Sequence, residues 1–245
     1  MKISVVIPVL NERSSLPATI AALRSCRGLA EIIVADGGST DGTIPWLQGQ
    51  PDIVVVRSMR GKGPQINVGA AAAFDVSGAA ASGLSSNALL FLHADSLISQ
   101  PAIDALHAAL ADQQLAGGAF YIRFAESRPR SLGLVAWGIN VRARFRNSAT
   151  GDQGIFVRQN VFQSIGGAPE WPLFEDVELV RRIKQAGKFT VLKMPLTVSG
   201  RRYIEHGVFR TALLIYSLRL AYRLGVSPQR LKEWFRDARG KQKDN

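Results

Sequence analysis

The chain has 245 residues, of which 47% are hydrophobic and 20% charged, and this composition predicts one globular domain with a sizeable core. Its single cysteine excludes an internal disulfide framework and a cysteine-based zinc cluster, which indicates a reducing compartment. The first apolar run begins at residue 3, which leaves no room for a signal peptide, and no run of about 18 uncharged apolar residues predicts a membrane span. We therefore expect a cytoplasmic protein.

Two short apolar runs near the amino terminus stop abruptly at polar residues. Residues 3–9 and 32–35 are rich in β-branched side chains, which is typical of strands buried on both faces of a parallel sheet. The residues that directly follow are Asn11 and Glu12 after the first strand, and Asp36, Gly37 and Ser39 after the second. Because ligands bind off the carboxyl ends of parallel strands, we expect both loops to meet at one crevice.

Strand and helix signals alternate through the first half of the chain. Ser14 and Ser15 are candidate caps for a helix with Pro17 in its first turn. Further strands are expected at 53–56 and 89–92, and an alanine-rich helix is expected from about 64 to 73. Residues 79–86 are small and polar and are expected to form an exposed loop. The alternation predicts an α/β fold with a doubly wound, mostly parallel sheet flanked by helices.

The second half predicts strands at 117–124, 151–157 and 190–194, and a basic, partly helical segment at 128–147. A helix is expected to begin near Glu175. These elements complete a domain that we place at residues 1–200. Residues 201–245 then form a separate helical extension.

The extension at residues 201–245 carries eleven Lys and Arg against four Asp and Glu, a net +7 of the total +11. A stripe of five apolar residues recurs at helical spacing: Phe209, Leu213, Tyr216, Leu220 and Leu224. Such a stripe packs against its own domain, pairs two subunits in a homodimer, or lies on an anionic membrane surface. No recognised nucleic-acid motif accompanies the charge, so nucleic acid is not an expected partner.

The ordered segments described above, together with Arg60–Gly63, His93–Asp95 and Glu175–Asp176, resemble the family 2 glycosyltransferases, which have a GT-A fold. The resemblance covers about residues 3 to 200. It implies an inverting enzyme that moves a sugar from a nucleotide diphosphate sugar, UDP-linked, to a hydroxyl group on a small-molecule or lipid acceptor. Two segments, 92–96 and 151–158, more narrowly resemble the subgroup linked to arsenosugar biosynthesis.

The resemblance implies a role for individual residues. Asp36 would accept a hydrogen bond from uracil, and Lys62 would close over the phosphates. Asp95 would hold Mg²⁺ or Mn²⁺ on the diphosphate. His93 replaces the first acid of the family's metal motif, which puts strict metal dependence in question. The full donor-binding set is Pro8, Asn11, Glu12, Asp36, Gly37, Ser39, Lys62, Asn67, His93, Asp95, Asp152, Gln153 and Arg202.

Asp176 resembles the catalytic base of the inverting enzymes, with Glu175 as its acidic neighbour, although both also suit a helix cap. His206 follows the last strand at a position where many GT-A enzymes complete the metal site. Two alternatives stay open: a nucleotide-sugar-binding module without catalysis, and a nucleotidyltransferase on a similar fold. The latter needs a glycine-rich, basic first loop, and residues 9–12 lack it.

Overall fold

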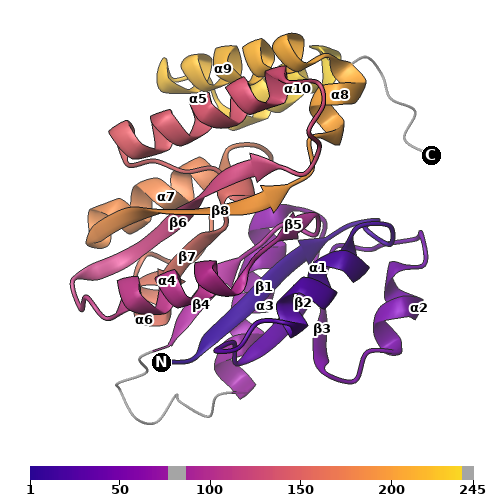
Figure 1. The fold of residues 1–245 in the computed structure, drawn as a ribbon, viewed down its shortest axis with the longest axis vertical. Helices are drawn as coiled ribbons and strands as arrows, with labels where there is room; N and C mark the ends of the chain where they lie inside the picture. The colour runs from indigo at the N-terminus through magenta and orange to yellow at the C-terminus, as the bar shows by residue number, and fades with distance from the viewer. Residues whose placement is uncertain (77–86, 239–245) are drawn as a thin grey trace.

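The structure is a computed structural model that describes residues 1–76 and 87–238 (Figure 1). Within these residues eight strands form one sheet in the order β3-β2-β1-β4-β7-β6-β8-β5. The strands are β1 (Ile3–Val9), β2 (Glu31–Asp36), β3 (Ile53–Arg57), β4 (Ala88–Phe91), β5 (Ser96–Leu97), β6 (Leu115–Phe124), β7 (Ile155–Arg158) and β8 (Lys188–Val198). The helices are α1 (Leu16–Arg24), α2 (Thr43–Gln48), α3 (Lys62–Val76), α4 (Gln100–Leu110), α5 (Ser131–Arg146), α6 (Gln159–Ser164), α7 (Glu175–Ala186), α8 (Arg201–His206), α9 (Val208–Arg223) and α10 (Pro228–Ala238).

The first four strands run parallel, as predicted. β1 pairs with both β2 and β4, and β2 pairs with β3. In this register Val9, the last residue of β1, lies beside Asp36, the last residue of β2. The polar loops that follow β1, β2 and β4 therefore leave the sheet at the same edge.

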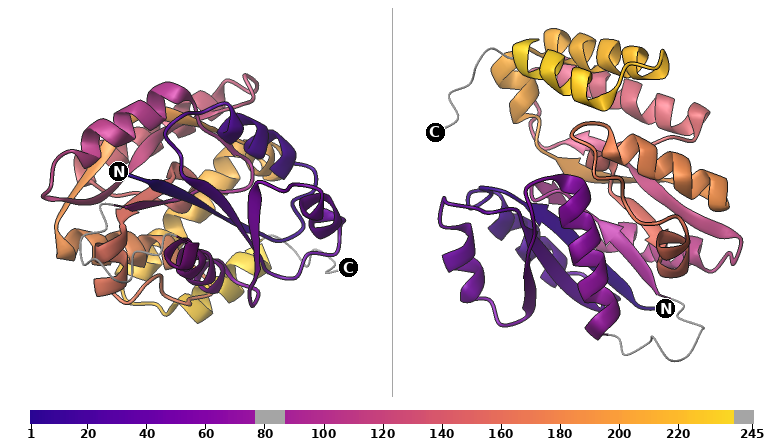
Figure 2. Two further views of the ribbon diagram at one scale, coloured as in Figure 1. Left: turned by 90° about the horizontal axis from the view of Figure 1, so that it is seen from below. Right: turned by 180° about the vertical axis from the view of Figure 1, so that it is seen from behind.

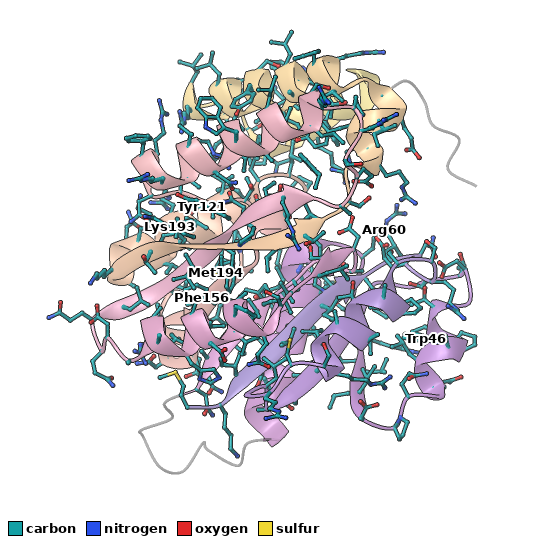
Figure 3. All side chains as sticks on the ribbon, in the orientation of Figure 1. Trp46, Arg60, Tyr121, Phe156, Lys193 and Met194 are labelled. Atoms are coloured by element: carbon teal, nitrogen blue, oxygen red, sulfur yellow. The ribbon has the colours of Figure 1, made fainter. Side chains whose placement is uncertain are left out.

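The remaining strands make the sheet mixed. β7 runs antiparallel to both β4 and β6, whereas β6 and β8 pair in parallel, and the short β5 is antiparallel to β8. Gly118 of β6 lets this sheet close tightly, since an added Cβ would lie 2.4 Å from the Phe156 ring and from the Thr190 carbonyl oxygen. Phe156, labelled in Figure 3, is fully buried on β7, the strand that pairs with both β4 and β6.

Helices cover both faces of the sheet. One apolar cluster joins the sheet to α1 and α4, through residues such as Ile20 and Leu106, and a second joins it to α3, α6 and α7, through residues such as Ile66 and Ile183. Figure 2 shows α3 on the opposite side of the sheet from α1. The predicted doubly wound arrangement is therefore confirmed.

The helix boundaries refine several expectations. Pro17 lies in the first turn of α1 as expected, but the Ser15 hydroxyl donates to the Glu12 carboxylate at 2.6 Å and makes no capping bond to the helix. The segment expected to be partly helical is one continuous helix, α5. Helix α4 corresponds to no sequence prediction. The predicted loop at 79–86 lies outside the described residues.

Helices α8, α9 and α10 form the extension and lie with α5 at one end of the molecule (Figures 1 and 2). A small apolar core of Phe174, Leu218 and Leu231 attaches the extension to the start of α7. The predicted stripe is not this packing face. Its five residues are exposed: Phe209 by 70%, Leu213 by 72%, Tyr216 by 45%, Leu220 by 58% and Leu224 by 77%. Packing on its own domain is therefore the wrong interpretation of the stripe.

Candidate functional site

The loops after β1 and β2 are tied together by their own polar groups. Asn11 has a left-handed backbone (φ 57°), and its side-chain oxygen accepts a hydrogen bond from the Thr40 backbone N–H at 2.8 Å. The backbone N–H of Asn11 donates to the Ser39 hydroxyl at 2.9 Å, and that of Glu12 donates to Thr43 Oγ1 at 3.1 Å. The two loops are thus held as one unit at the edge of the sheet, as the sequence predicts.

Asp36 is buried at the base of this unit, with 3% of its surface exposed. Its carboxylate accepts hydrogen bonds from the backbone N–H groups of Gly38 at 2.8 Å and Ser39 at 3.1 Å. Gln65 of α3 donates from below to the carbonyl oxygens of Val9 and Ala35 and packs closely under Gly37. Pro8 lies one residue before this junction, within β1. The structure thus places Pro8, Gly37 and Ser39 beside the Asp36 carboxylate, whose position is fixed by these hydrogen bonds.

A separate cavity of about 260 Å³ lies between the sheet, the start of α7 and the extension. Seven residues from the predicted site line it: Lys62, His93, Asp95, Asp152, Glu175, Asp176 and Arg202. They come from α3, the loop after β4, the loop before β7, α7 and α8. The structure therefore collects residues spread over 140 positions of the chain into one site.

Lys62 and His93 contact each other, with Lys62 Nζ 3.1 Å from His93 Nε2. Enclosure by the protein and the positive charges of Lys62 and Arg202 hold the pKa of His93 well below its usual range. The ring is therefore neutral at pH 7, and its Nε2 accepts a hydrogen bond from the Lys62 ammonium, which assigns the ring proton to Nδ1. His93 consequently positions a cation rather than presenting a free nitrogen to a metal.

The acidic pair lies at the amino-terminal end of α7. Asp176 accepts hydrogen bonds from the Gly151 N–H at 2.6 Å and from the Val177 N–H at 2.7 Å, which fix the orientation of its carboxylate. Glu175 is 9% exposed, and burial together with the charge of Asp176 raises its pKa to about 7. The two acids therefore differ: one is oriented by backbone donors, and the other exchanges its proton near neutral pH.

Local backbone geometry supports this arrangement. Phe174, just before the pair, has a left-handed backbone (φ 63°) that is rare for an aromatic residue, and its ring packs 5.3 Å from that of Tyr222 on α9. Gly151 faces the pair from the opposite wall, where an added Cβ would lie 2.8 Å from His93 Nε2. The extension and a glycine therefore hold Asp176 close to His93.

Three further predicted residues, Asn67, Gln153 and His206, do not line the cavity. The side-chain amide of Asn67 exchanges two hydrogen bonds with the Ala168 backbone, at 3.0 and 2.8 Å, and so anchors that loop to α3. Gln153 is fully buried and donates to the Phe120 carbonyl oxygen at 3.0 Å. His206, at the end of α8, is not among the described residues that line the cavity. The amide groups of Asn67 and Gln153 are thus already bonded to protein, and Gln153 Oε1 accepts a hydrogen bond from Arg142, which lines the cavity.

Asp95 is the residue best placed to hold a divalent cation. Its side chain is exposed to the solvent in the cavity, although the surrounding walls raise its pKa by desolvation. Across the described residues no cluster of three or more His, Cys, Asp or Glu could enclose a metal. Mg²⁺ and Mn²⁺ are commonly held by one or two carboxylates together with phosphate oxygens. Asp95 fits that mode of binding, whereas His93 is occupied by Lys62.

The sequence did not single out several residues that line the cavity, among them Arg142 of α5, Tyr203 of α8 and Arg219 of α9. Burial and the nearby Asp152 raise the pKa of Tyr203 to about 12, so its hydroxyl stays protonated. These residues lie in helices that looked merely basic or amphipathic. No motif or spacing marked their inward faces.

Comparisons with known proteins agree with this geometry. A family model described as Glycosyl transferase family 2 matches residues 4–165, well over half of the chain. No curated protein matches the chain in a sequence comparison.

Solved structures share the fold at low sequence identity. The Pyrobaculum calidifontis mannosyltransferase PcManGT, in complex with GDP-Man and Mn²⁺, matches with a TM-score of 0.60 and 22% identity over 94% of this chain and 67% of that one. S. aureus TarS 1–349 in complex with UDP-GlcNAc matches with a TM-score of 0.59 and 17% identity over 81% of this chain and 58% of that one. In a longer TarS structure the match spans only 39% of the TarS chain.

These similarities confirm the GT-A type of fold, and the family model supplies the family. The acids at the ends of β1, β2 and β4 lie within residues 4–165 that the family model matches, and the acidic pair on α7 lies after them. The chain belongs to glycosyl transferase family 2.

Proposed function

We propose that the protein is an inverting glycosyltransferase that moves a sugar from a UDP-sugar to a hydroxyl acceptor. One observation carries this proposal: Lys62, Asp95 and Asp176 line the same cavity although they come from three different elements. A cation, a carboxylate able to hold a metal, and a second, oriented carboxylate are the groups that such a transfer needs.

The donor nucleotide is proposed to bind at the paired loops after β1 and β2. Asn11, Glu12, Gly37 and Ser39 would surround the nucleotide, and the fixed Asp36 carboxylate would accept the imide N–H of uracil. TarS has been solved in complex with UDP-GlcNAc and PcManGT in complex with GDP-Man, which supports a nucleoside diphosphate sugar as the donor.

The diphosphate is proposed to lie between these loops and the acidic pair. Lys62 and Arg202, which both act electrostatically on Asp95, would neutralise its charge. Asp95 would hold Mg²⁺ or Mn²⁺, which when bound would supply further positive charge to the departing diphosphate. The Mn²⁺ in the PcManGT complex supports this metal for the fold.

In the proposed reaction Asp176 accepts the proton of the acceptor hydroxyl as its oxygen attacks the anomeric carbon. The new carbon–oxygen bond forms on the face opposite the diphosphate. The bond from the anomeric carbon to the diphosphate oxygen breaks, and its electron pair leaves with UDP. The products are the glycoside with inverted configuration and UDP, and the proton remains on Asp176 until it passes to solvent.

An activity assay with a panel of nucleotide sugars and a matched pair of variants tests this mechanism. Asp176→Asn keeps the size of the side chain but cannot take a proton, so we expect turnover to fall by about 10²–10⁴ while UDP-sugar affinity changes little. Asp104→Asn, an exposed acid on α4, is the control and should leave turnover unchanged. Donor binding without UDP release by the wild type would instead favour the non-catalytic module. Near-normal turnover of Asp176→Asn would reject Asp176 as the base.

We also propose that residues 1–200 form the catalytic unit and residues 201–245 a basic extension that attaches to an anionic membrane surface. Two helices expose large apolar residues: the stripe on α9, and Leu134, Trp137 and Phe145 on α5, which are 65%, 66% and 79% exposed. Exposed arginines, Arg144 and Arg223, lie next to these residues in the sequence. No helix in the described part of the chain is long and apolar enough to cross a bilayer. Apolar contact together with positive charge is typical of a peripheral helix.

Co-sedimentation with vesicles tests the membrane proposal. The protein should bind vesicles of anionic lipid, dissociate from them at high salt, and not bind vesicles of neutral lipid. Trp137→Ser and Leu213→Ser should each weaken binding, whereas Met59→Ser, at a residue 72% exposed in the amino-terminal half, should not. If the protein forms a homodimer without lipid, and Trp137→Ser and Leu213→Ser abolish that dimer, then this surface binds a second subunit and not a membrane.

Segments 92–96 and 151–158 resemble the arsenosugar-biosynthesis subgroup. From this resemblance we propose an organoarsenical as the acceptor. A hydroxyl-bearing organoarsenical in the acceptor panel tests it. Failure of that compound alone would leave the transferase proposal intact.

A further inference from the structure

Two arginines line the cavity without complete hydrogen bonding. Arg219 of α9 is only 8% exposed, and its Nη1 is buried with no hydrogen-bond partner in the described part of the chain. Arg142 of α5 donates from Nη2 to Gln153 Oε1 at 3.0 Å, while its buried Nε has no partner there either. Buried guanidinium groups normally satisfy their donors because an unpaired one is costly. Two unfilled donors beside a cavity therefore indicate a ligand.

Two arginines and two aspartates act electrostatically on Arg219. Burial, followed by the like charges of Arg142 and Arg223, lowers the pKa of Arg219 to about 10, against the opposing effect of Asp176 and Asp152. No salt bridge joins Arg219 to either acid in the residues that the structure covers. Asp176 instead accepts backbone hydrogen bonds from Gly151 and Val177.

The wall next to the arginines is apolar. Val135 and Ile139 of α5, Ile215 and Leu218 of α9, and Phe235 of α10 all line the same cavity. These helices also expose the apolar surface proposed above to face the membrane. A ligand in this part of the cavity would therefore meet cationic donors next to Asp176 and hydrocarbon beyond them.

We propose that Arg142 and Arg219 bind an anionic group of the acceptor, which is a hydroxyl-bearing amphiphile with a phosphate or carboxylate near its hydroxyl and an apolar chain. This inference rests on the proposed function, since it places the acceptor beside Asp176. The subsite uses other helices than the proposed diphosphate site, since Arg142 and Arg219 come from α5 and α9, whereas Lys62 and Arg202 come from α3 and α8. Gln153 is a positioning residue here, because its Oε1 orients Arg142.

Calorimetry with three small probes at constant ionic strength tests the subsite: hexyl phosphate, hexanol and inorganic phosphate. We expect the wild type to bind hexyl phosphate at least tenfold more tightly than either of the other two, because each of them lacks one half of the proposed contacts. Equal affinity for hexyl phosphate and hexanol would overturn the anion subsite. Equal affinity for hexyl phosphate and inorganic phosphate would show a free-anion site and overturn the amphiphile.

Variants of Arg219 then assign the binding to this subsite. Arg219→Gln should lower hexyl phosphate affinity at least tenfold, whereas Arg223→Gln, exposed one turn further along α9, should keep it. Arg219→Met, which fills the same space without an unpaired polar group, replaces the glutamine variant if that one melts early. Unchanged hexyl phosphate binding in a folded Arg219 variant would overturn the proposal.

UDP affinity of the same variants separates this inference from the proposed function. Arg219→Gln should bind UDP as the wild type does. Loss of UDP and hexyl phosphate together would move Arg219 to the donor diphosphate and overturn the acceptor subsite. If the wild type binds no UDP, the proposed function is refuted. The hexyl phosphate measurement uses no donor, so its result tests the anion subsite independently of UDP binding.

Discussion

Glu175 should make the protein less stable as the pH rises. Its pKa is raised from 4.5 to about 7, first by burial and then by the charge of Asp176. The folded state therefore keeps a proton that the unfolded state has already lost between these two pH values. Stability linked to this group is fully present below about pH 4.5 and is lost as the pH rises through about 7.

The magnitude follows from the size of the shift. One pKa unit corresponds to about 1.4 kcal/mol, so the wild type should lose about 2–3 kcal/mol of unfolding free energy through Glu175 between pH 5 and pH 8.5. Glu175→Gln mimics the protonated side chain at every pH. Its stability advantage over the wild type should therefore be larger at pH 8.5 than at pH 5 by about 2–3 kcal/mol.

Urea unfolding followed by tryptophan fluorescence at the two pH values measures this difference. Glu178→Gln is the matched control because its pKa is lowered by its hydrogen bonds to Arg181 and Arg182. That variant should lose stability relative to the wild type at pH 8.5, with a smaller loss at pH 5, the opposite trend. A stability difference between Glu175→Gln and the wild type that does not change with pH would refute the reasoning.

Three further predictions address the donor, the metal and the packing. Asp36→Ala should weaken UDP binding by about 1.5–3 kcal/mol in calorimetry, and unchanged affinity would remove Asp36 from the site. Mn²⁺ should strengthen UDP binding to the wild type but not to Asp95→Asn, and full wild-type activity in excess EDTA would reject the metal. Gly63→Ala should cost about 1–3 kcal/mol in urea unfolding, because its Cβ would lie 2.2 Å from the Pro169 carbonyl oxygen. Gly133→Ala, a helical glycine with open space around it, should be neutral or stabilising by up to about 1 kcal/mol, and equal effects of the two changes would contradict the close packing at Gly63.

Local patterns in the sequence were enough to predict the first four strands and the start of α7. A run of β-branched residues that ends at a polar loop specifies a buried strand and the end of the sheet at which its loop emerges. Asn11, Asp36 and His93 could therefore be assigned to one edge before any contact was known. Glu175 and Asp176 were likewise predicted at a helix start, since acids favour that position.

The tertiary structure alone decided which polar side chains face the cavity. Asn67, Gln153 and Asp152 are all polar residues that the sequence assigned to the donor site. The amides of Asn67 and Gln153 bond to protein, however, because the loop at Ala168 and strand β6 lie against them. The contact of Lys62 with His93 joins the start of α3 to the loop after β4, 31 residues further along the chain. Such pairings depend on how elements pack, and no local period of the sequence records them.

The extension shows the same division. Helical spacing correctly identified an apolar stripe on α9, and the sequence allowed packing, pairing or membrane contact for it. The structure showed that the opposite face, with Leu218 and Arg219, is the buried one. A period of 3.6 residues reveals that a helix has two faces, but only the position of neighbouring helices decides which face is covered. The sequence thus determined the elements and the edge where their polar loops meet, and tertiary packing decided which side chains face the cavity.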